Sequence, residues 1–137
     1  MDSAYPFLTQ IVQPTDLHRL TDRELLEVAA EVRRAILDKV SKTGGHFSSN
    51  LGTVELTVAM YAAYSIPPDK VIWDTGHQAY PHKMLTGRLD QFDTLRKHKG
   101  LSGFRKRDES EMDNFGAGHA GTAISAALGF AVARDQL

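Results

Sequence analysis

Cysteine is absent from this 137-residue sequence, and other scarce features exclude further classes of protein. Without thiols the chain forms no disulfide, no thiolate metal site and no cysteine nucleophile. The longest apolar stretch, Ala126 to Ala133, is far shorter than the ~20 residues that span a bilayer. Charge of either sign is not in excess, since 16 Lys and Arg against 17 Asp and Glu give a net charge of −1. The electrostatic basis for general binding to nucleic acid or anionic membranes is therefore missing.

A targeting segment is also missing from the beginning of the sequence. Met1 to Pro6 contains an acid and a proline, where a signal peptide needs a basic end and an apolar run, so we expect a cytoplasmic protein. A hydrophobic content of 42% and a mean hydropathy of −0.31 are typical of a soluble globular domain. The unusual feature is six histidines, of which His46, His77 and His119 directly follow glycine.

Hydrophobic periodicity predicts a chain that is mostly helical. Thr21 and Glu24 have the spacing of a capping box. The apolar stripe that follows them predicts a helix over 22–43, which Gly44-Gly45 ends. By the same reasoning, further helices are expected over 53–64, 79–85 and 91–98 and from Gly121 onward.

One segment has the composition of a β-strand. Lys70 to Asp74 is a short β-branched and aromatic run closed by Thr75-Gly76, which is typical of a buried strand in a parallel sheet. We therefore expect an α/β fold of the αβα type, with one clear strand near 70–74. A lone buried strand leaves its backbone groups unpaired, so this sheet is expected to be incomplete.

The segment 100–118 lacks periodicity and is predicted to be a loop. Its basic run, Arg105 to Arg107, is followed by acidic residues at Asp108, Glu109, Glu111 and Asp113. Because the charges balance locally, a solvated loop is favoured over a phosphate clamp or a nucleic-acid patch.

Each Gly-His pair lies at a junction between predicted elements, where glycine permits a tight turn and a close approach to a ligand. A single histidine there is most often capped or packed. If the three imidazoles meet, they could ligate zinc, or they could contact a diphosphate and move protons at a carbonyl group. Helix N-termini near Ser48-Ser49 and after Gly118 would add phosphate donors. The absence of an HExxH motif favours the diphosphate interpretation modestly.

Three blocks of sequence carry a resemblance to a known family. Gly44 to Ala59 (GGHFSSNLGTVELTVA) and Trp73 to Lys83 (WDTGHQAYPHK) are similar to motifs of the 1-deoxy-D-xylulose-5-phosphate synthases. A third block, 100–111, leads into Gly118-His119 and 124–129, and the similarity is nearly collinear from about residue 17 to residue 135.

The resemblance implies a thiamine-diphosphate-dependent transferase that joins pyruvate to D-glyceraldehyde 3-phosphate with loss of carbon dioxide. The product would feed the synthesis of isoprenoid precursors, thiamine and pyridoxal phosphate. His46 corresponds to a catalytic residue beside the reacting centre. The positions that correspond to cofactor-binding residues are His77, Gly118, His119 and Ala120, which Ser49 could join.

Some residues depart from the family pattern. Ala120-Gly121-Thr122-Ala123 stands where a serine-rich string is usual, so backbone contacts to the cofactor could survive there and hydroxyl contacts could not. Arg105 stands where proline is common, and Asn50 where a small residue is common. These differences put the hydroxyl ligands and the loop shapes in doubt.

The resemblance also places essential parts outside the sequence. The Mg²⁺ that holds the diphosphate is bound in the family by a Gly-Asp-Gly motif and an asparagine, expected beyond Leu137, so no metal ligand is assigned here. We expect 1–20 to be a lead segment and 21–137 to be the first part of a thiamine-diphosphate-binding domain. This part would be inactive without the remaining synthase polypeptide, and the complete enzyme would be a homodimer with no nucleic-acid or membrane partner.

Two alternatives stay open. One is a segment of a transketolase-like enzyme with different sugar substrates. The other is a non-catalytic truncated paralogue that binds another chain through a small-residue helix face formed by Ser125, Gly129 and Ala133.

Overall fold

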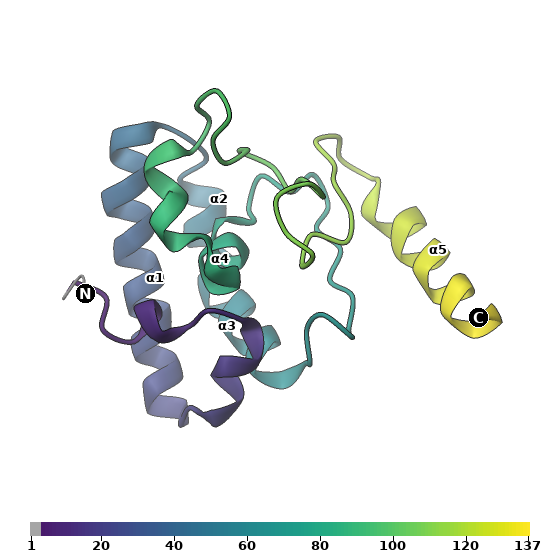
Figure 1. Ribbon diagram of the computed structural model, residues 1–137, viewed down its shortest axis with the longest axis horizontal. Coiled ribbons are helices and arrows are strands. Elements are labelled where there is room, and N and C mark those ends of the chain that lie inside the picture. Colours follow the sequence, from purple (N-terminus) through teal and green to yellow (C-terminus); the bar gives the residue numbers. More distant parts are fainter. Residues whose placement is uncertain (1–3) are drawn as a thin grey trace.

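Helix α1, Asp22–Thr43, is the element on which most of the others pack (Figure 1). The computed structural model describes residues 4–137. The predicted bounds of this helix and its capping box are confirmed: the Thr21 hydroxyl accepts from the Glu24 amide at 3.4 Å, and the Glu24 carboxylate accepts from the Thr21 amide at 2.8 Å. Gly44 ends the helix with a φ of 74°, a conformation that costs glycine little.

The remaining helices are shorter. Two 3₁₀ turns, η1 (Leu8–Gln10) and η2 (Pro14–Arg19), precede α1, and α2 (Ser48–Leu51) and α3 (Val54–Ala63) follow it. The helix α4 (Tyr80–Lys83) continues into the π-helical turn η3 (Met84–Arg88) and the 3₁₀ helix η4 (Leu89–Thr94). The last helix is α5 (Ala123–Gln136).

The helices predicted over 53–64 and 79–85 and after Gly121 are thus confirmed, with somewhat different ends. The helix predicted over 91–98 is only partly right, because η4 ends at Thr94. Leu95 leaves the helical region with a ψ of 127°, and Arg96 has a positive φ of 61°.

The strand predicted at 70–74 is wrong: residues 70–73 are irregular and Asp74 is a bend, and the structure described has no strand. A strand requires a neighbouring extended segment to receive its backbone hydrogen bonds. Here the Val71 carbonyl instead accepts from the Arg105 guanidinium at 2.7 Å. The αβα sheet is therefore not formed by residues 4–137, whereas the predominantly helical character is as expected.

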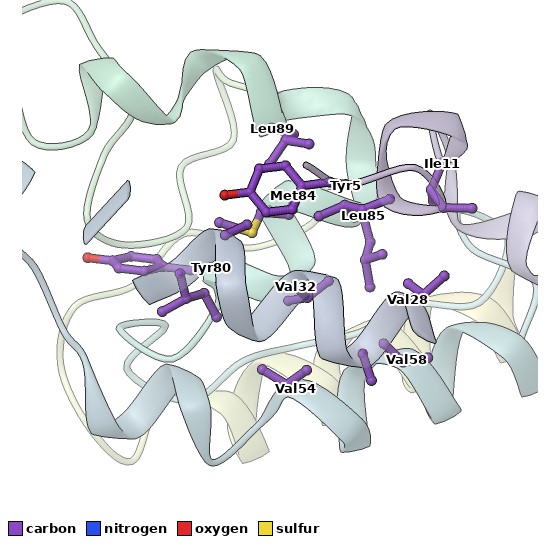
Figure 2. Packing of buried hydrophobic residues seen from close by; sticks show 14 of the residues in the cluster. Tyr5, Ile11, Val28, Val32, Val54, Val58, Tyr80, Met84, Leu85 and Leu89 are labelled. Carbon is purple, nitrogen blue, oxygen red and sulfur yellow. The ribbon is translucent and has the colours of Figure 1, made fainter. Parts of the chain in front are cut away.

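One hydrophobic core joins the N-terminal turns, α1, α3 and the segment that begins at α4 (Figure 2). Val28 and Val32 lie four residues apart on α1, as Val54 and Val58 do on α3, and this spacing places each pair on one helix face. Further buried side chains come from Tyr5, Ile11, Tyr80, Met84, Leu85 and Leu89.

Helix α5 lies to one side of this core (Figure 1) and has no buried residue. Ile124 and Leu128 are exposed over 83% and 64% of their surfaces. The small-residue face is exposed at Ser125, Gly129 and Ala133, and no atom lies within 4 Å of a Cβ built on Gly129. None of the helices described has both the length and the apolarity that crossing a membrane requires.

A buried carboxylate attaches the N-terminal segment to α1. Glu31 is 2% exposed, and its Oε2 accepts from the backbone amides of Phe7 at 2.9 Å and Leu8 at 2.7 Å. These amides lie near the first 3₁₀ turn, where the helix itself offers them no acceptor.

We expect Glu31→Ala to lower the free energy of unfolding by about 1–3 kcal/mol, because two amides lose their acceptor. Urea unfolding followed by circular dichroism measures the change. Glu27→Ala, at an exposed position of the same helix, is the control and should change the value by less than about 0.5 kcal/mol. Equal effects of the two substitutions would contradict the role given to Glu31.

Candidate functional site

The first two Gly-His pairs meet in the structure. His46 follows the end of α1 and His77 precedes α4, yet their ring centroids are 5.2 Å apart, with the planes inclined by 70°. Phe104, from the loop predicted over 100–118, also packs against His46, with the ring centroids 5.4 Å apart. The convergence considered from the sequence therefore occurs for these two motifs.

The glycines of these two pairs are required by their surroundings. Gly45 has a φ of 148°, and a Cβ at this position would lie 2.7 Å from the Tyr80 hydroxyl. Gly76 has a φ of 84°, and its Cβ would lie 3.3 Å from the Arg105 amide. Gly118 differs, because no atom lies within 4 Å of a Cβ built there. Close packing thus explains glycine in the first two motifs and not in the third.

The environment of His46 favours a neutral imidazole. Burial lowers its pKa, and the nearby His77 and Arg96 lower it further. The Tyr80 hydroxyl accepts from the His46 amide at 3.3 Å and lies 3.4 Å from Nδ1. Because burial raises the pKa of Tyr80, its phenol keeps the proton that it can donate to Nδ1. His46 can then exchange a proton with a substrate through Nε2.

His77 contributes a polar atom without a protein partner. Its Nδ1 is buried and has no hydrogen bond to the part of the chain that the structure describes. Buried polar atoms in proteins are nearly always hydrogen-bonded, so an unpartnered one beside a second histidine indicates a position for a ligand atom.

The third motif is connected to the second through a carboxylate. Asp74 accepts from the amides of Gly121 and Thr122 at 3.0 Å each and from that of Ala123 at 3.2 Å. These bonds lower the pKa of Asp74. The amides at the start of α5, which the sequence suggested as phosphate donors, are therefore already engaged.

The other predicted residues lie around these groups. Gly118, His119 and Ala120 are exposed ahead of α5, and Ser49 is half-buried on the four-residue helix α2. Nowhere in residues 4–137 do three or more histidine or acidic side chains gather in a way that could hold a metal ion. The zinc site considered from the three imidazoles is therefore not assembled.

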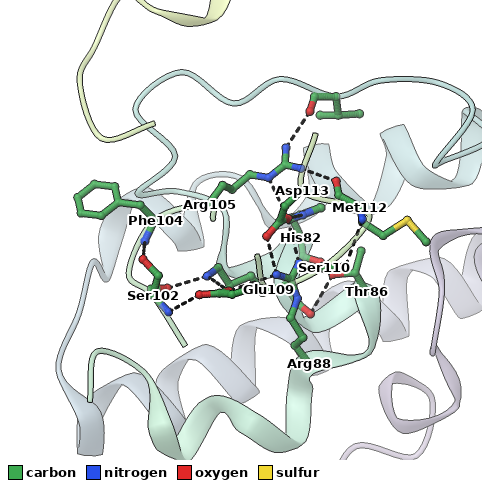
Figure 3. Close-up of polar contacts among 12 residues, drawn as sticks. His82, Thr86, Arg88, Ser102, Phe104, Arg105, Glu109, Ser110, Met112 and Asp113 are labelled. Atoms are coloured by element: carbon green, nitrogen blue, oxygen red, sulfur yellow. Dashed lines mark hydrogen bonds and ion pairs between the residues drawn. The ribbon is translucent and has the colours of Figure 1, made fainter. Parts of the chain in front are cut away.

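A cluster of buried ionisable side chains, which we call the Asp113 cluster, lies where the loop over 100–118 meets α4 and η3 (Figure 3). Its members are Asp113, His82, Arg88 and Arg105. Asp113 is bonded to His82 Nε2 at 2.6 Å, to Arg88 Nη1 at 2.7 Å and to Arg105 Nε at 3.1 Å. The cluster fastens the loop that carries Asp113 and Arg105 to α4 and η3.

A second ion pair anchors the same loop. Lys83 Nζ lies 2.6 Å from the Glu109 carboxylate and donates to the Ser102 carbonyl at 2.7 Å. Glu109 also accepts from the Ser102 amide at 2.7 Å. The loop is thereby fixed on both sides of Phe104, which explains how this ring is held against His46.

The expectation of a solvated basic run is wrong for Arg105. This side chain is buried, and its guanidinium also donates to the carbonyls of Val71 and Met112, while Lys106 and Arg107 are exposed. The local charge balance correctly indicated the pairing of Arg105 with Asp113. It could not show that Asp113 and Glu109 also bind His82, Lys83 and Arg88, which lie about 20 to 30 residues earlier in the sequence. Tyr80 was missed because an aromatic residue at a helix start gives no functional signal.

Protonation within the Asp113 cluster follows from burial. Burial lowers the pKa of His82 to about 3, and the guanidinium groups of Arg105 and Arg88 act in the same direction. Burial alone would raise the pKa of Asp113, but the hydrogen bonds from His82 and Arg88 outweigh it and hold the pKa below its usual range. His82 is therefore neutral and accepts at Nδ1 from Tyr61, while Asp113 is ionised.

The family model and the curated relatives that match this chain carry the same description. The model of a family described as 1-deoxy-D-xylulose-5-phosphate synthase matches residues 8–137. The chain is 56% identical over 134 residues to the 1-deoxy-D-xylulose-5-phosphate synthase of Leptothrix cholodnii, and 56% identical over 135 residues to that of Chlorobaculum tepidum. Each match covers 98% of this chain and 21% of the relative. The chain thus spans about a fifth of the length of these curated relatives.

The pKa of His82 predicts a loss of stability in acid. The unfolded chain binds a proton at His82 near pH 6.5, whereas the folded chain does so only near pH 3. The contribution of neutral His82 to the free energy of unfolding is therefore fully present above about pH 6.5. As the pH decreases toward 3, this contribution falls by at most about 1.4 kcal/mol per pH unit.

Urea unfolding at pH 7 and pH 5 tests this expectation. The free energy of unfolding of the unmodified chain should fall by about 2 kcal/mol more than that of His82→Gln, which cannot take up the proton. His98→Gln, at an exposed position, should keep the pH dependence of the unmodified chain. The same pH dependence in all three proteins would contradict a buried neutral His82.

Proposed function

Because the chain belongs to the family of 1-deoxy-D-xylulose-5-phosphate synthases, we propose that it forms the first part of a thiamine-diphosphate-binding domain. The complete enzyme would join pyruvate to D-glyceraldehyde 3-phosphate with loss of carbon dioxide. As the chain spans 21% of its relatives, this activity is proposed for an assembly with the remaining synthase polypeptide. Residues 1–20 would be the lead segment, and residues 21–137 would belong to the cofactor domain.

The observation that carries the proposal is the pair of facing histidines. His46 and His77 lie 5.2 Å apart, and His77 Nδ1 is buried without a partner in the described chain. A diphosphate cofactor offers polar atoms that would satisfy such a nitrogen, so this part of the site fits the cofactor. The start of α5 offers fewer donors to a diphosphate, because the amides of residues 121–123 already donate to Asp74.

When bound, thiamine diphosphate supplies the chemistry at the carbonyl carbon of pyruvate. His77 would hold a polar atom of the cofactor through Nδ1, and the backbone at Gly118, His119 and Ala120 would lie along it. Ser49 could add a hydroxyl. His46, neutral because its pKa is lowered, would accept and return a proton at the substrate. Phe104, packed on His46, would exclude water from that side of the imidazole.

The rest of the proposal concerns the assembly. The Mg²⁺ that accompanies the diphosphate would take its ligands from the polypeptide that follows this segment in the relatives. The complete enzyme would be a cytoplasmic homodimer. The exposed apolar residues of α5 give the remaining polypeptide a surface on which to pack.

A grafted enzyme tests the proposed function. This chain replaces the matching segment of the Chlorobaculum tepidum synthase, and product formation is measured with pyruvate, D-glyceraldehyde 3-phosphate, thiamine diphosphate and Mg²⁺. We expect activity in the graft, and a decrease in kcat of about 10²–10⁴-fold in its His46→Ala variant, because a general acid–base group is lost.

The control variant is His98→Gln, at an exposed position, which should keep the activity of the graft. A folded graft without activity would overturn the assignment and favour a non-catalytic binding chain. Activity with a different ketose or aldose pair would favour the transketolase-like alternative. Product formation by the 137-residue chain alone would contradict the need for the remaining polypeptide.

A further inference from the structure

The side chain of Asn50 lies fully buried between the two facing Gly-His pairs. Its Nδ2 donates to the His46 carbonyl at 2.7 Å and to the His77 carbonyl at 2.8 Å, and its Oδ1 accepts from the Tyr80 amide at 2.7 Å. Both amide protons and the amide oxygen are thus used, and two of the three partners lie far away in the sequence.

We propose that Asn50 is a positioning residue, which sets the separation of His46 and His77 and the placement of Tyr80 beside His46. One planar amide holds the backbone of both histidines, so the distance between their Cα atoms is fixed by a single rigid group. The same amide fixes the backbone of Tyr80, whose hydroxyl reaches back to His46. Three parts of the site therefore share one anchor.

The chemistry of the anchor is specific to asparagine. The side chain at this position must offer two donors on one side and one acceptor on the other. Among uncharged side chains, only asparagine and glutamine do so. Aspartate would place an oxygen against two carbonyl oxygens, and alanine would leave two carbonyls and one amide without these partners. Thr53 provides a second, weaker link, because its hydroxyl lies 2.9 Å from the Gln78 carbonyl. We therefore expect the segment that carries His77 and Gln78 to stay attached to Thr53 when Asn50 is replaced.

This inference concerns geometry and is independent of activity, although its meaning for catalysis rests on the proposed function. The groups that face His46 are His77, Tyr80, Phe104 and Arg96. Loss of the anchor would let the two histidines separate and admit water to His46. Both changes weaken the effects that lower its pKa.

Nuclear magnetic resonance of the 137-residue chain tests the proposal. The pKa of His46 is measured by titration, together with the nuclear Overhauser contacts between the His46 and His77 rings. In Asn50→Ala we expect the pKa of His46 to rise toward its ordinary value, because burial and the neighbouring His77 would lower it less, and the ring contacts to weaken. Asn50→Ser, which supplies one hydroxyl in place of the amide and so can replace part of its hydrogen bonding, should give a smaller change in both quantities.

The matched control is Val28→Ala, which removes buried volume from α1 in its first half, away from the site. It should lower stability while leaving the pKa of His46 and the ring contacts unchanged. A folded Asn50→Ala with an unchanged His46 pKa and unchanged contacts would overturn the proposal.

A measurement on the unmodified chain covers the case in which the variants do not fold. Both side-chain amide protons of Asn50 should then exchange with solvent at least about 100-fold more slowly than those of an exposed asparagine, because each is buried and bonded. Rapid exchange would overturn the proposal. None of these measurements depends on catalysis, so their failure is distinct from a failure of the grafted enzyme.

Discussion

The structure around the site depends on the buried carboxylate of Asp113. It lies between His82, Arg88 and Arg105, and removing one partner from such a buried group costs about 3–5 kcal/mol, because the remaining charges lose their compensation. The interaction joins a loop without regular structure to the helical segment 80–88. Through this attachment, Phe104 is brought to His46, so a group that takes no part in the proposed chemistry determines the shape of the site.

Two other polar side chains join the three Gly-His motifs. Asn50 connects the first with the second through neutral backbone bonds, and Asp74 connects the second with the third through a carboxylate at the start of α5. The first connection is buried, whereas Asp74 is partly exposed. The histidine pair is accordingly the well-defined part of the site. His119, in contrast, is exposed.

Local features of the fold were predictable from the sequence, and long-range features were not. The bounds of α1 follow from Thr21, Glu24 and Gly44, whose effects act within a few residues. The segment 70–74 has the composition of a strand, but a strand forms only beside a partner. Arg105 looked solvated because the sequence shows its acidic neighbours and hides the fold that buries it. The meeting of His46 with His77 was a reasonable hypothesis, whereas the anchoring role of Asn50 depends on distances that no motif encodes.

The central claim is that His46 and His77 line one cofactor site. A crystal structure of the grafted synthase with thiamine diphosphate and Mg²⁺ tests it most directly. We predict that both imidazoles border the bound cofactor and that His77 Nδ1 lies within hydrogen-bonding distance of one of its polar atoms. An ordered cofactor whose polar atoms lie away from both histidines would contradict this claim.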